Sequence, residues 1–133
     1  MNLYISTENA NSDFELLDFL HLLNEIIDIE SSVFRVLSYE YNNVKGDWRK
    51  VRKELLDYLG NESSEGILIS YQEFYVFASF IGQTIEGNFQ LISKSREYTI
   101  NFEVFDSIFW NLSTDNIEIF NLLTKNKKIE AML

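Results

Sequence analysis

The spacing of the apolar residues predicts a long amphipathic helix near the start of the chain. Between residues 13 and 30, apolar side chains recur every three or four positions, which is typical of a helix with one buried face. Ser12, followed three residues later by Glu15, forms the capping-box pattern that marks a helix start. We therefore expect a helix over residues 13–30.

A second helix is predicted over residues 48–59. Asp47 is a favoured N-cap, and Trp48 begins an apolar stripe that we expect to face inward. Gly60 follows as the predicted C-terminal stop.

Two more helices are predicted in the second half of the chain. Ser70 and Glu73 form another capping-box pattern, which predicts a helix over residues 71–84. The last helix is expected over residues 115–125, and residues 127–133 are expected to fray.

Other segments alternate between apolar and polar residues or are rich in β-branched and aromatic residues, which favours strands. The predicted strands are residues 32–41, 89–93, 98–104 and 108–112. Gly87 and Asn88 predict a turn before the second of these strands. Asp106 and Ser107 interrupt the alternation between the last two, which predicts a bulge or a tight turn.

The pattern as a whole predicts one α+β domain over residues 1–133, with about four helices packed on a mostly antiparallel sheet. The chain has 133 residues and 46% hydrophobic residues, enough for a real core without a linker or a second domain. We expect no signal peptide and no membrane association, because the apolar stretches are short and interrupted. The absence of Cys is compatible with the cytoplasm.

Acidic residues dominate the charge. The chain has 21 Asp and Glu against 11 Lys and Arg, a formal net charge of −10, and residues 1–30 contain no Lys or Arg. Asp18, Glu25, Asp28 and Glu30 are the predicted partner-binding acids of the first helix. The last three lie towards its C-terminal end, where negative charge opposes the helix dipole and a basic partner would relieve the repulsion. The competing interpretation is an ordinary solvated helix face.

The residue types exclude most familiar catalytic chemistry. With no Cys and five Gly, the sequence contains no nucleophile with its base, no metal-ligand cluster and no Gly-rich phosphate loop. His21 is the one imidazole, and with Asp18 and Glu25 it would supply three ligands from a single helix. An ordinary hydrogen bond is the favoured role for His21, and we expect no metal and no cofactor.

A basic run follows the first predicted strand and raises the alternative of nucleic-acid binding. Its members are Lys45, Arg49, Lys50, Arg52 and Lys53. A net charge of −10 opposes this alternative, and Glu54 and Asp57 offer ion pairs to Lys50 and Lys53 within the helix. We therefore expect an intramolecular salt-bridge surface and no nucleic-acid partner.

A second candidate contact lies at the interruption between the last two strands. Asp106 and Trp110 place a carboxylate and a large aromatic ring near a point where a bulge or a turn can redirect side chains. Ser107 has no predicted base beside it, so it is not expected to act as a nucleophile.

Residues 67–124 resemble a known class of proteins. The order of a capped helix at Ser70-Tyr71-Gln72-Glu73, then Ile85-Glu86-Gly87-Asn88-Phe89, then a strand region at residues 106–113 (DSIFWNLS) resembles small acidic immunity proteins encoded beside bacterial polymorphic or contact-dependent toxins. The resemblance implies a cytoplasmic, non-enzymatic inhibitor that occludes the active site of a basic toxin domain, such as a nuclease. The low Ala and high Ile and Asn content also indicates a low-GC bacterial genome. A small enzyme built on carboxylate and Tyr groups, or an adaptor subunit of a cytoplasmic complex, remains an alternative.

Overall fold

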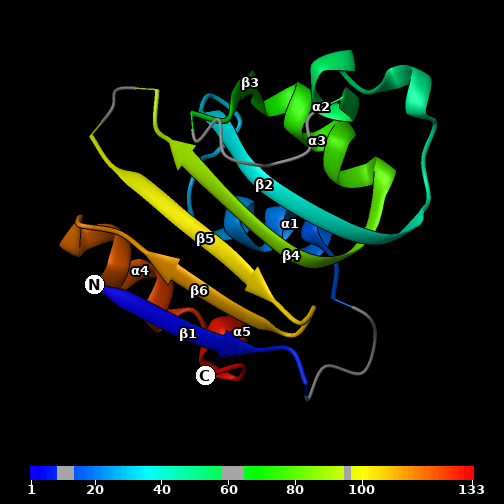
Figure 1. Cartoon of the computed structure of the whole chain (residues 1–133). Helices are drawn as coiled ribbons and strands as arrows, with labels where there is room; N and C mark the ends of the chain where they lie inside the picture. The colour runs from blue at the N-terminus through cyan, green and yellow to red at the C-terminus, as the bar shows by residue number, and fades with distance from the viewer. Residues whose placement is uncertain (9–13, 58–64, 95–96) are drawn as a thin grey trace.

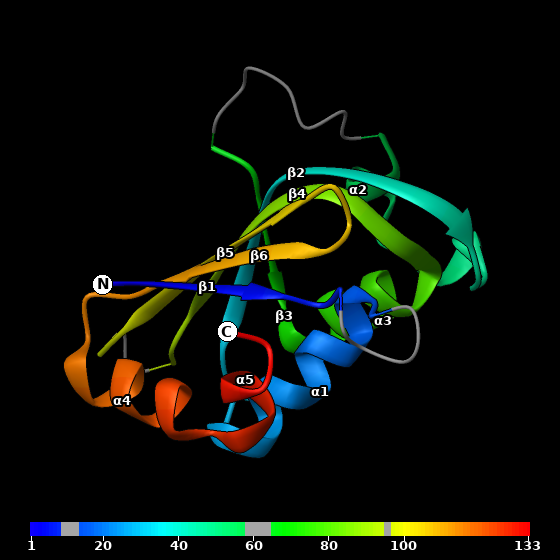
Figure 2. The same ribbon diagram turned by 90° about the horizontal axis from the view of Figure 1, so that it is seen from below.

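A six-stranded antiparallel sheet forms the centre of the fold, and helices pack against one of its faces (Figures 1 and 2). The computed structural model describes residues 1–8, 14–57, 65–94 and 97–133. The strands are β1 (Asn2–Ser6), β2 (Val33–Val44), β3 (Ile67–Ser70), β4 (Ile81–Ile92), β5 (Thr99–Phe105) and β6 (Phe109–Ser113). Their order across the sheet is β1-β6-β5-β4-β2-β3, and every neighbouring pair is antiparallel. The predicted α+β class with an antiparallel sheet is confirmed.

Five α-helices and one 3-10 helix are found within the described residues. They are α1 (Leu16–Ile26), the 3-10 helix (Trp48–Lys50), α2 (Lys53–Asp57), α3 (Tyr71–Phe80), α4 (Ile117–Lys125) and α5 (Lys127–Glu130). Figure 2 shows α1, α4 and α5 on one side of the sheet. Figure 1 views the sheet from its other side, where no described helix covers β1, β5 or β6. None of the helices in the described ranges is long and apolar enough to cross a membrane.

Aromatic rings fill the space between the helices and the sheet. Phe19 of α1 stacks on Trp110 of β6, with ring centroids 4.6 Å apart, and lies 5.0 Å from the ring of Phe102. Phe74 of α3 stacks on Phe34 of β2 at 4.4 Å. All five rings are at most 1% exposed. Each such side chain contributes about 1.5–3 kcal/mol by burial, so the core supplies the main stabilisation of the fold.

The first helix is shorter than the sequence predicts. Glu15 occupies the N-cap and Asp18 completes a capping box with it, while the backbone becomes extended at Ile27. The predicted N-cap Ser12 lies outside the described residues. The observed capping box therefore begins three residues later than the predicted one, at a residue type that is not among the favoured N-caps.

The prediction of one continuous helix over residues 48–59 is wrong, because the structure has two short helices in this region. Asp47 does cap a helical turn, since Asp47 Oδ1 accepts from the Arg49 N–H at 3.0 Å, but that turn is a 3-10 helix that ends at the extended Val51. The chain becomes helical again in α2. Trp48 is 62% exposed instead of facing inward, and the predicted stop at Gly60 lies outside the described residues.

The third helix begins as predicted and ends early. Ser70 and Glu73 form the predicted capping box of α3, but the helix gives way to β4 at Ile81. The predicted turn at Gly87 and Asn88 is therefore wrong: both residues lie inside β4. A Cβ on Gly87 would meet the Phe89 ring at 2.5 Å, so this glycine is required by a close approach of a side chain.

The two ends of the chain are more ordered than predicted. β1 pairs with β6 and buries Leu3 and Ile5, although no strand was predicted there. The expected fraying of residues 127–133 is wrong, because these residues include α5 and bury Ile129 completely. The strand predicted over residues 32–41 is confirmed and extends to Val44 as β2.

Candidate binding surface

The acids predicted to bind a partner do not form one face. Asp18 and Glu25 line a groove beside α5 together with His21 and Lys128. Asp18 Oδ2 accepts from the Glu15 N–H at 2.8 Å, and Glu25 Oε2 accepts from Lys128 Nζ at 2.9 Å. The basic partner that the end of α1 was expected to need is therefore supplied, for Glu25, by the chain itself.

Asp28 and Glu30 lie beyond the end of α1 and face different surroundings. Asp28 Oδ1 accepts from the Glu30 N–H at 3.2 Å, and Asp28 lines a cavity with Ser32, Ser93 and Tyr98. Burial raises the pKa of the Tyr98 phenol, and the negative charges of Asp28 and Glu97 add to this shift. The two acids are exposed, and Glu30 acts on another tyrosine: its negative charge adds to the rise that burial causes in the pKa of Tyr71.

His21 makes an ordinary polar contact. Its Nε2 lies 3.4 Å from the Tyr75 hydroxyl of α3, and the two rings are tilted with centroids 5.8 Å apart. Within the described ranges, no three His, Cys, Asp or Glu side chains are grouped in a way that could hold a metal ion.

The basic run is largely engaged in ion pairs within the chain. Lys45 Nζ lies 2.8 Å from Glu15 Oε1, and Arg49 Nε lies 3.0 Å from Asp47 Oδ1. Arg52 pairs with Glu54 and, at 3.3 Å, with Glu73 of α3. These pairs differ from the predicted ones, since Glu54 binds Arg52 rather than Lys50, and the side chain of Asp57 lies outside the described part of the structure.

Trp110 has to be removed from the predicted contact residues. It is 1% exposed, and its ring is held between Phe19 and Phe14, whose centroids lie at 4.6 and 5.6 Å. The residue occupies the buried phase of β6, so its ring faces the helices and cannot reach a partner. The alternation of apolar residues over 108–112 already favours a buried position for Trp110.

Asp106 lies where the sequence predicted, in a tight turn between β5 and β6. Asp106 and Ser107 both have positive φ, 51° and 68°, and the Ile108 N–H donates to Phe105 O at 3.3 Å. A turn with two left-handed central residues matches the twist of a hairpin and usually contains Asn or Gly. The carboxylate of Asp106 is exposed at the tip of this hairpin.

Exposed aromatic residues accompany Asp106 on the helix-free face of the sheet. Tyr4, Phe105 and Phe109 are 67%, 47% and 46% exposed; these three residues are called the aromatic patch below. They occupy the outward-facing positions of β1, β5 and β6, and the other outward-facing positions of these strands are polar. None of the three is among the contact residues predicted from the sequence, although Phe105 falls on the polar phase of its strand, which is a signal of exposure.

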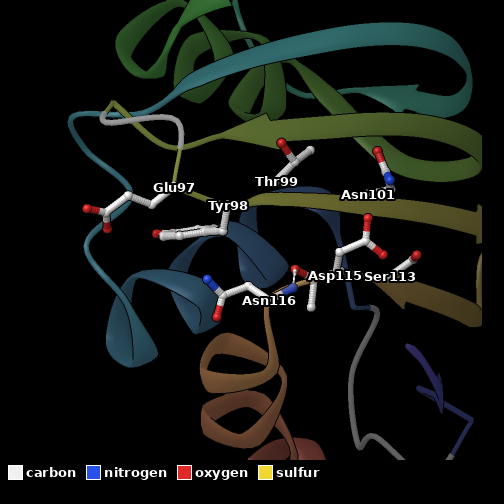
Figure 3. Close-up of a pocket in the computed structure, with 8 residues that line it drawn as sticks. Glu97, Tyr98, Thr99, Asn101, Ser113, Asp115 and Asn116 are labelled. Atoms are coloured by element: carbon white, nitrogen blue, oxygen red, sulfur yellow. Dashed lines mark hydrogen bonds between the residues drawn. The ribbon is translucent and has the colours of Figure 1, made fainter.

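A polar cavity of about 350 Å³ lies between the ends of β5 and β6 and the start of α4 (Figure 3). Its lining residues are Glu97, Tyr98, Thr99, Asn101, Ser113, Thr114, Asp115 and Asn116. Several of their polar atoms serve the fold: Asn101 Oδ1 accepts from Gln90 Nε2 at 2.9 Å, and Asn116 Oδ1 caps α4 through the Ile119 N–H at 3.0 Å. Thr114 Oγ1 likewise accepts from the Asn116 N–H at 3.2 Å, beside the start of α4.

The sheet face that carries the aromatic patch is thus the strongest candidate for binding. β1, β4, β5 and β6 include Glu86 and Glu103 and contain no Lys or Arg. Exposed aromatic rings beside uncompensated carboxylates suit the core and rim of a protein interface. Comparison of this chain with protein-family models, with curated proteins and with solved structures finds no match.

Proposed function

We propose that this protein is a non-enzymatic acidic inhibitor that neutralises a basic bacterial toxin domain by covering its active site. The observation that carries the proposal is the charge of the uncovered sheet face. Four adjacent strands contain no cation, in a chain whose net charge is −10. A basic protein surface is the partner that such a face attracts most strongly.

Nucleases are the toxin class that fits this charge best. A nuclease must attract phosphate, so the surface around its active site is positive. An acidic protein can occupy that surface in place of the nucleic acid, and electrostatic steering can raise the association rate constant to about 10⁸–10⁹ M⁻¹s⁻¹ at low salt. The resemblance of residues 67–124 to small acidic immunity proteins supports the same function, with the cytoplasm as the place of action.

The test is capture of the partner followed by an activity measurement. Tagged protein is used to capture binding proteins from the source bacterium at 50 mM and 500 mM NaCl, and each captured protein is expressed with and without this chain. We expect one basic protein, retained mainly at low salt, whose nuclease activity or growth inhibition falls when this chain is present. Capture of a complex whose activity is unchanged by the chain would contradict inhibition and favour an adaptor role.

A further inference from the structure

We propose that the aromatic patch anchors arginine side chains on the surface of the partner. This inference rests on the proposed function for the partner being a protein, and it assigns the contact to the helix-free face of the sheet. The acids of α1 then have no direct part in the contact. Three observations support this assignment: the strand register of the three aromatic residues, the local charge and the backbone hydrogen bonds at the hairpin tip.

Strand register brings the three residues of the aromatic patch together. Phe105 is directly opposite Phe109, and Phe109 is opposite Ser6. Tyr4 lies two residues from Ser6, which makes it the diagonal neighbour of Phe109. Cross-strand neighbours have Cβ atoms about 4.5–5.5 Å apart and diagonal neighbours about 7–8 Å. Isolated exposed rings are common on soluble proteins, but here the register places three of them on neighbouring strands of one sheet face.

The charges around the aromatic patch are negative. Asp106 follows Phe105 directly and is exposed, and Glu103 lies two residues earlier on the same face of β5. Glu86 of β4 is exposed next to Gly87, whose partner in β5 is Val104. In the described part of β1, β4, β5 and β6 no Lys or Arg offsets these carboxylates.

This combination selects arginine over lysine. A guanidinium group stacks on aromatic rings and binds carboxylates through two parallel hydrogen bonds, whereas an ammonium group is a compact and strongly hydrated charge. An arginine that binds at Phe105 would find the exposed carboxylate of Asp106 on the next residue of the chain. The aliphatic part of the side chain would cover the remaining ring surface.

The backbone of the hairpin tip is held by hydrogen bonds on both sides, which fixes the positions of Phe105 and Phe109 on their strands. The Ser107 N–H donates to Ile85 O of β4 at 2.9 Å, and the Thr7 N–H donates to Ile108 O at 2.8 Å. Thr7 Oγ1 also donates to Ile108 O at 3.3 Å. A rigid contact surface loses little conformational entropy when it binds, which favours affinity.

The inference can be tested without the natural partner. The probe is an acetylated and amidated peptide of sequence Arg-Leu-Arg-Leu-Arg, titrated into ¹⁵N-labelled protein at low salt while the amide chemical shifts are followed. We expect saturable shifts centred on Tyr4, Phe105, Asp106 and Phe109. Phe109→Ser and Asp106→Lys should each weaken binding at least fivefold, and the peptide with Lys in place of Arg should bind more weakly to the wild-type protein.

Two controls separate the aromatic patch from general attraction. Trp48→Ser removes another exposed aromatic ring, beside the basic run, and Glu30→Lys reverses an exposed acid near the end of α1; both should leave the site and strength of peptide binding nearly unchanged. Tyr4→Ser repeats the test of Phe109→Ser on a different strand, in case one variant disturbs the fold. Two results would overturn the inference: shifts centred on α1, or peptide binding by both Phe109→Ser and Tyr4→Ser that is as tight as binding by the wild type.

The captured partner distinguishes this inference from the proposed function. If a basic toxin is captured and inhibited, but the variants Phe109→Ser and Asp106→Lys inhibit it as tightly as the wild type, the aromatic patch is not the contact and the function stands. If the peptide binds at the aromatic patch while no captured protein is inhibited, the contact chemistry stands and the inhibitory function fails.

Discussion

At the scale of single residues, the two tryptophans have opposite environments. Trp110 is 1% exposed and stacks on Phe19 at 4.6 Å, whereas Trp48 is 62% exposed at the start of a 3-10 helix. We expect Trp110→Ala to lower the free energy of unfolding by about 3–5 kcal/mol, because it leaves a large cavity in the core. Urea unfolding followed by circular dichroism measures this change.

Trp48→Ala is the matched control for Trp110→Ala. It removes the same side chain from the surface and should change the free energy of unfolding by less than about 0.5 kcal/mol. Equal losses of stability in the two variants would contradict the prediction, because it assigns a core role to the buried ring only.

The hairpin tip contains strain that a single substitution can remove. Ser107 has a φ of 68°, in the left-handed region that costs an ordinary residue roughly 1–2 kcal/mol. We expect Ser107→Gly to raise the free energy of unfolding by about 0.5–1 kcal/mol, since glycine adopts this conformation freely but is also less ordered in the unfolded chain. Ser113→Gly, inside β6, should instead lower it by a similar amount. A loss of stability in Ser107→Gly would show that the serine side chain outweighs the backbone strain.

At the scale of elements, the sequence predicted most of the helix starts and misplaced several ends. Helix starts have local signals, because a cap needs only a few consecutive residues. Examples are the capping box of Ser70 with Glu73 and the cap at Asp47. The signal that ends α3 at Phe80 is not local in the sequence. It depends on β4, which has to reach Ile81 to pair with Val44 of β2, so pairing with a distant segment overrides the helical pattern.

The same distinction explains the site. Trp110 is a predicted contact residue because it follows the expected bulge or turn at Asp106 and Ser107, although the alternation of its own strand favours a buried position. The register that joins Tyr4 to Phe109 spans about a hundred residues of sequence. Pairing at this separation has no local sequence signal, and β1 itself was too short to recognise.

The capping box of α3 predicts a pH dependence of stability. Hydrogen bonding to the Ser70 N–H holds the pKa of Glu73 below its usual range, and the positive charge of Arg52 contributes. A carboxylate with a lowered pKa stabilises the folded state above its ordinary pKa of about 4.3, and this contribution is lost as the pH falls through the lowered value. We expect Glu73→Gln to be about 0.3–1 kcal/mol less stable than the wild type at pH 6, with a smaller difference at pH 3.

Urea unfolding at several pH values measures this difference. Glu118→Gln is the control, because Glu118 lies in the first turn of α4 and outside the capping box of α3. A difference between Glu73→Gln and the wild type that stayed constant from pH 6 to pH 3 would exclude an ionised Glu73 as its source.

α5 is a structural element rather than a loose end. Ile129 is completely buried, and the Ser6 N–H donates to Met132 O at 2.7 Å. We expect Ile129→Ala to lower the free energy of unfolding by about 2–4 kcal/mol, whereas Ile117→Ala, at a position that is 57% exposed, should cost less than about 1 kcal/mol. Hydrogen exchange should show protection of the Ser6 amide in the wild type and faster exchange in Ile129→Ala.

At the scale of the whole molecule, both edges of the sheet have a backbone group engaged by another segment of the chain. At the β1 edge, the Ser6 N–H is paired with Met132 O. At the other edge, Arg52 Nη1 donates to Leu68 O of β3 at 3.4 Å. Partly covered edges limit strand-to-strand association, so the open face with the aromatic patch is the surface most available for contact.

The net charge should prevent this face from pairing with a second copy of itself. At neutral pH the charge of −10 keeps molecules apart, but near the sequence pI of about 4.5 the repulsion disappears. We expect wild-type protein in 150 mM NaCl to sediment as a monomer at pH 7.5 and to form larger species near pH 4.5. The double variant Phe105→Ser/Phe109→Ser should remain monomeric at both values.

Trp48→Ser tests whether any exposed ring would have the same effect, and circular dichroism at pH 4.5 establishes that each protein is still folded. Because Trp48 lies beside the basic run and outside the aromatic patch, its loss should leave association at pH 4.5 unchanged. If Trp48→Ser prevented association as well as the double variant does, the contact would depend on total exposed aromatic surface. If only the double variant loses association at pH 4.5, the helix-free sheet face associates with itself through its aromatic rings. The negative charge then prevents this self-association at neutral pH and favours a partner of opposite charge.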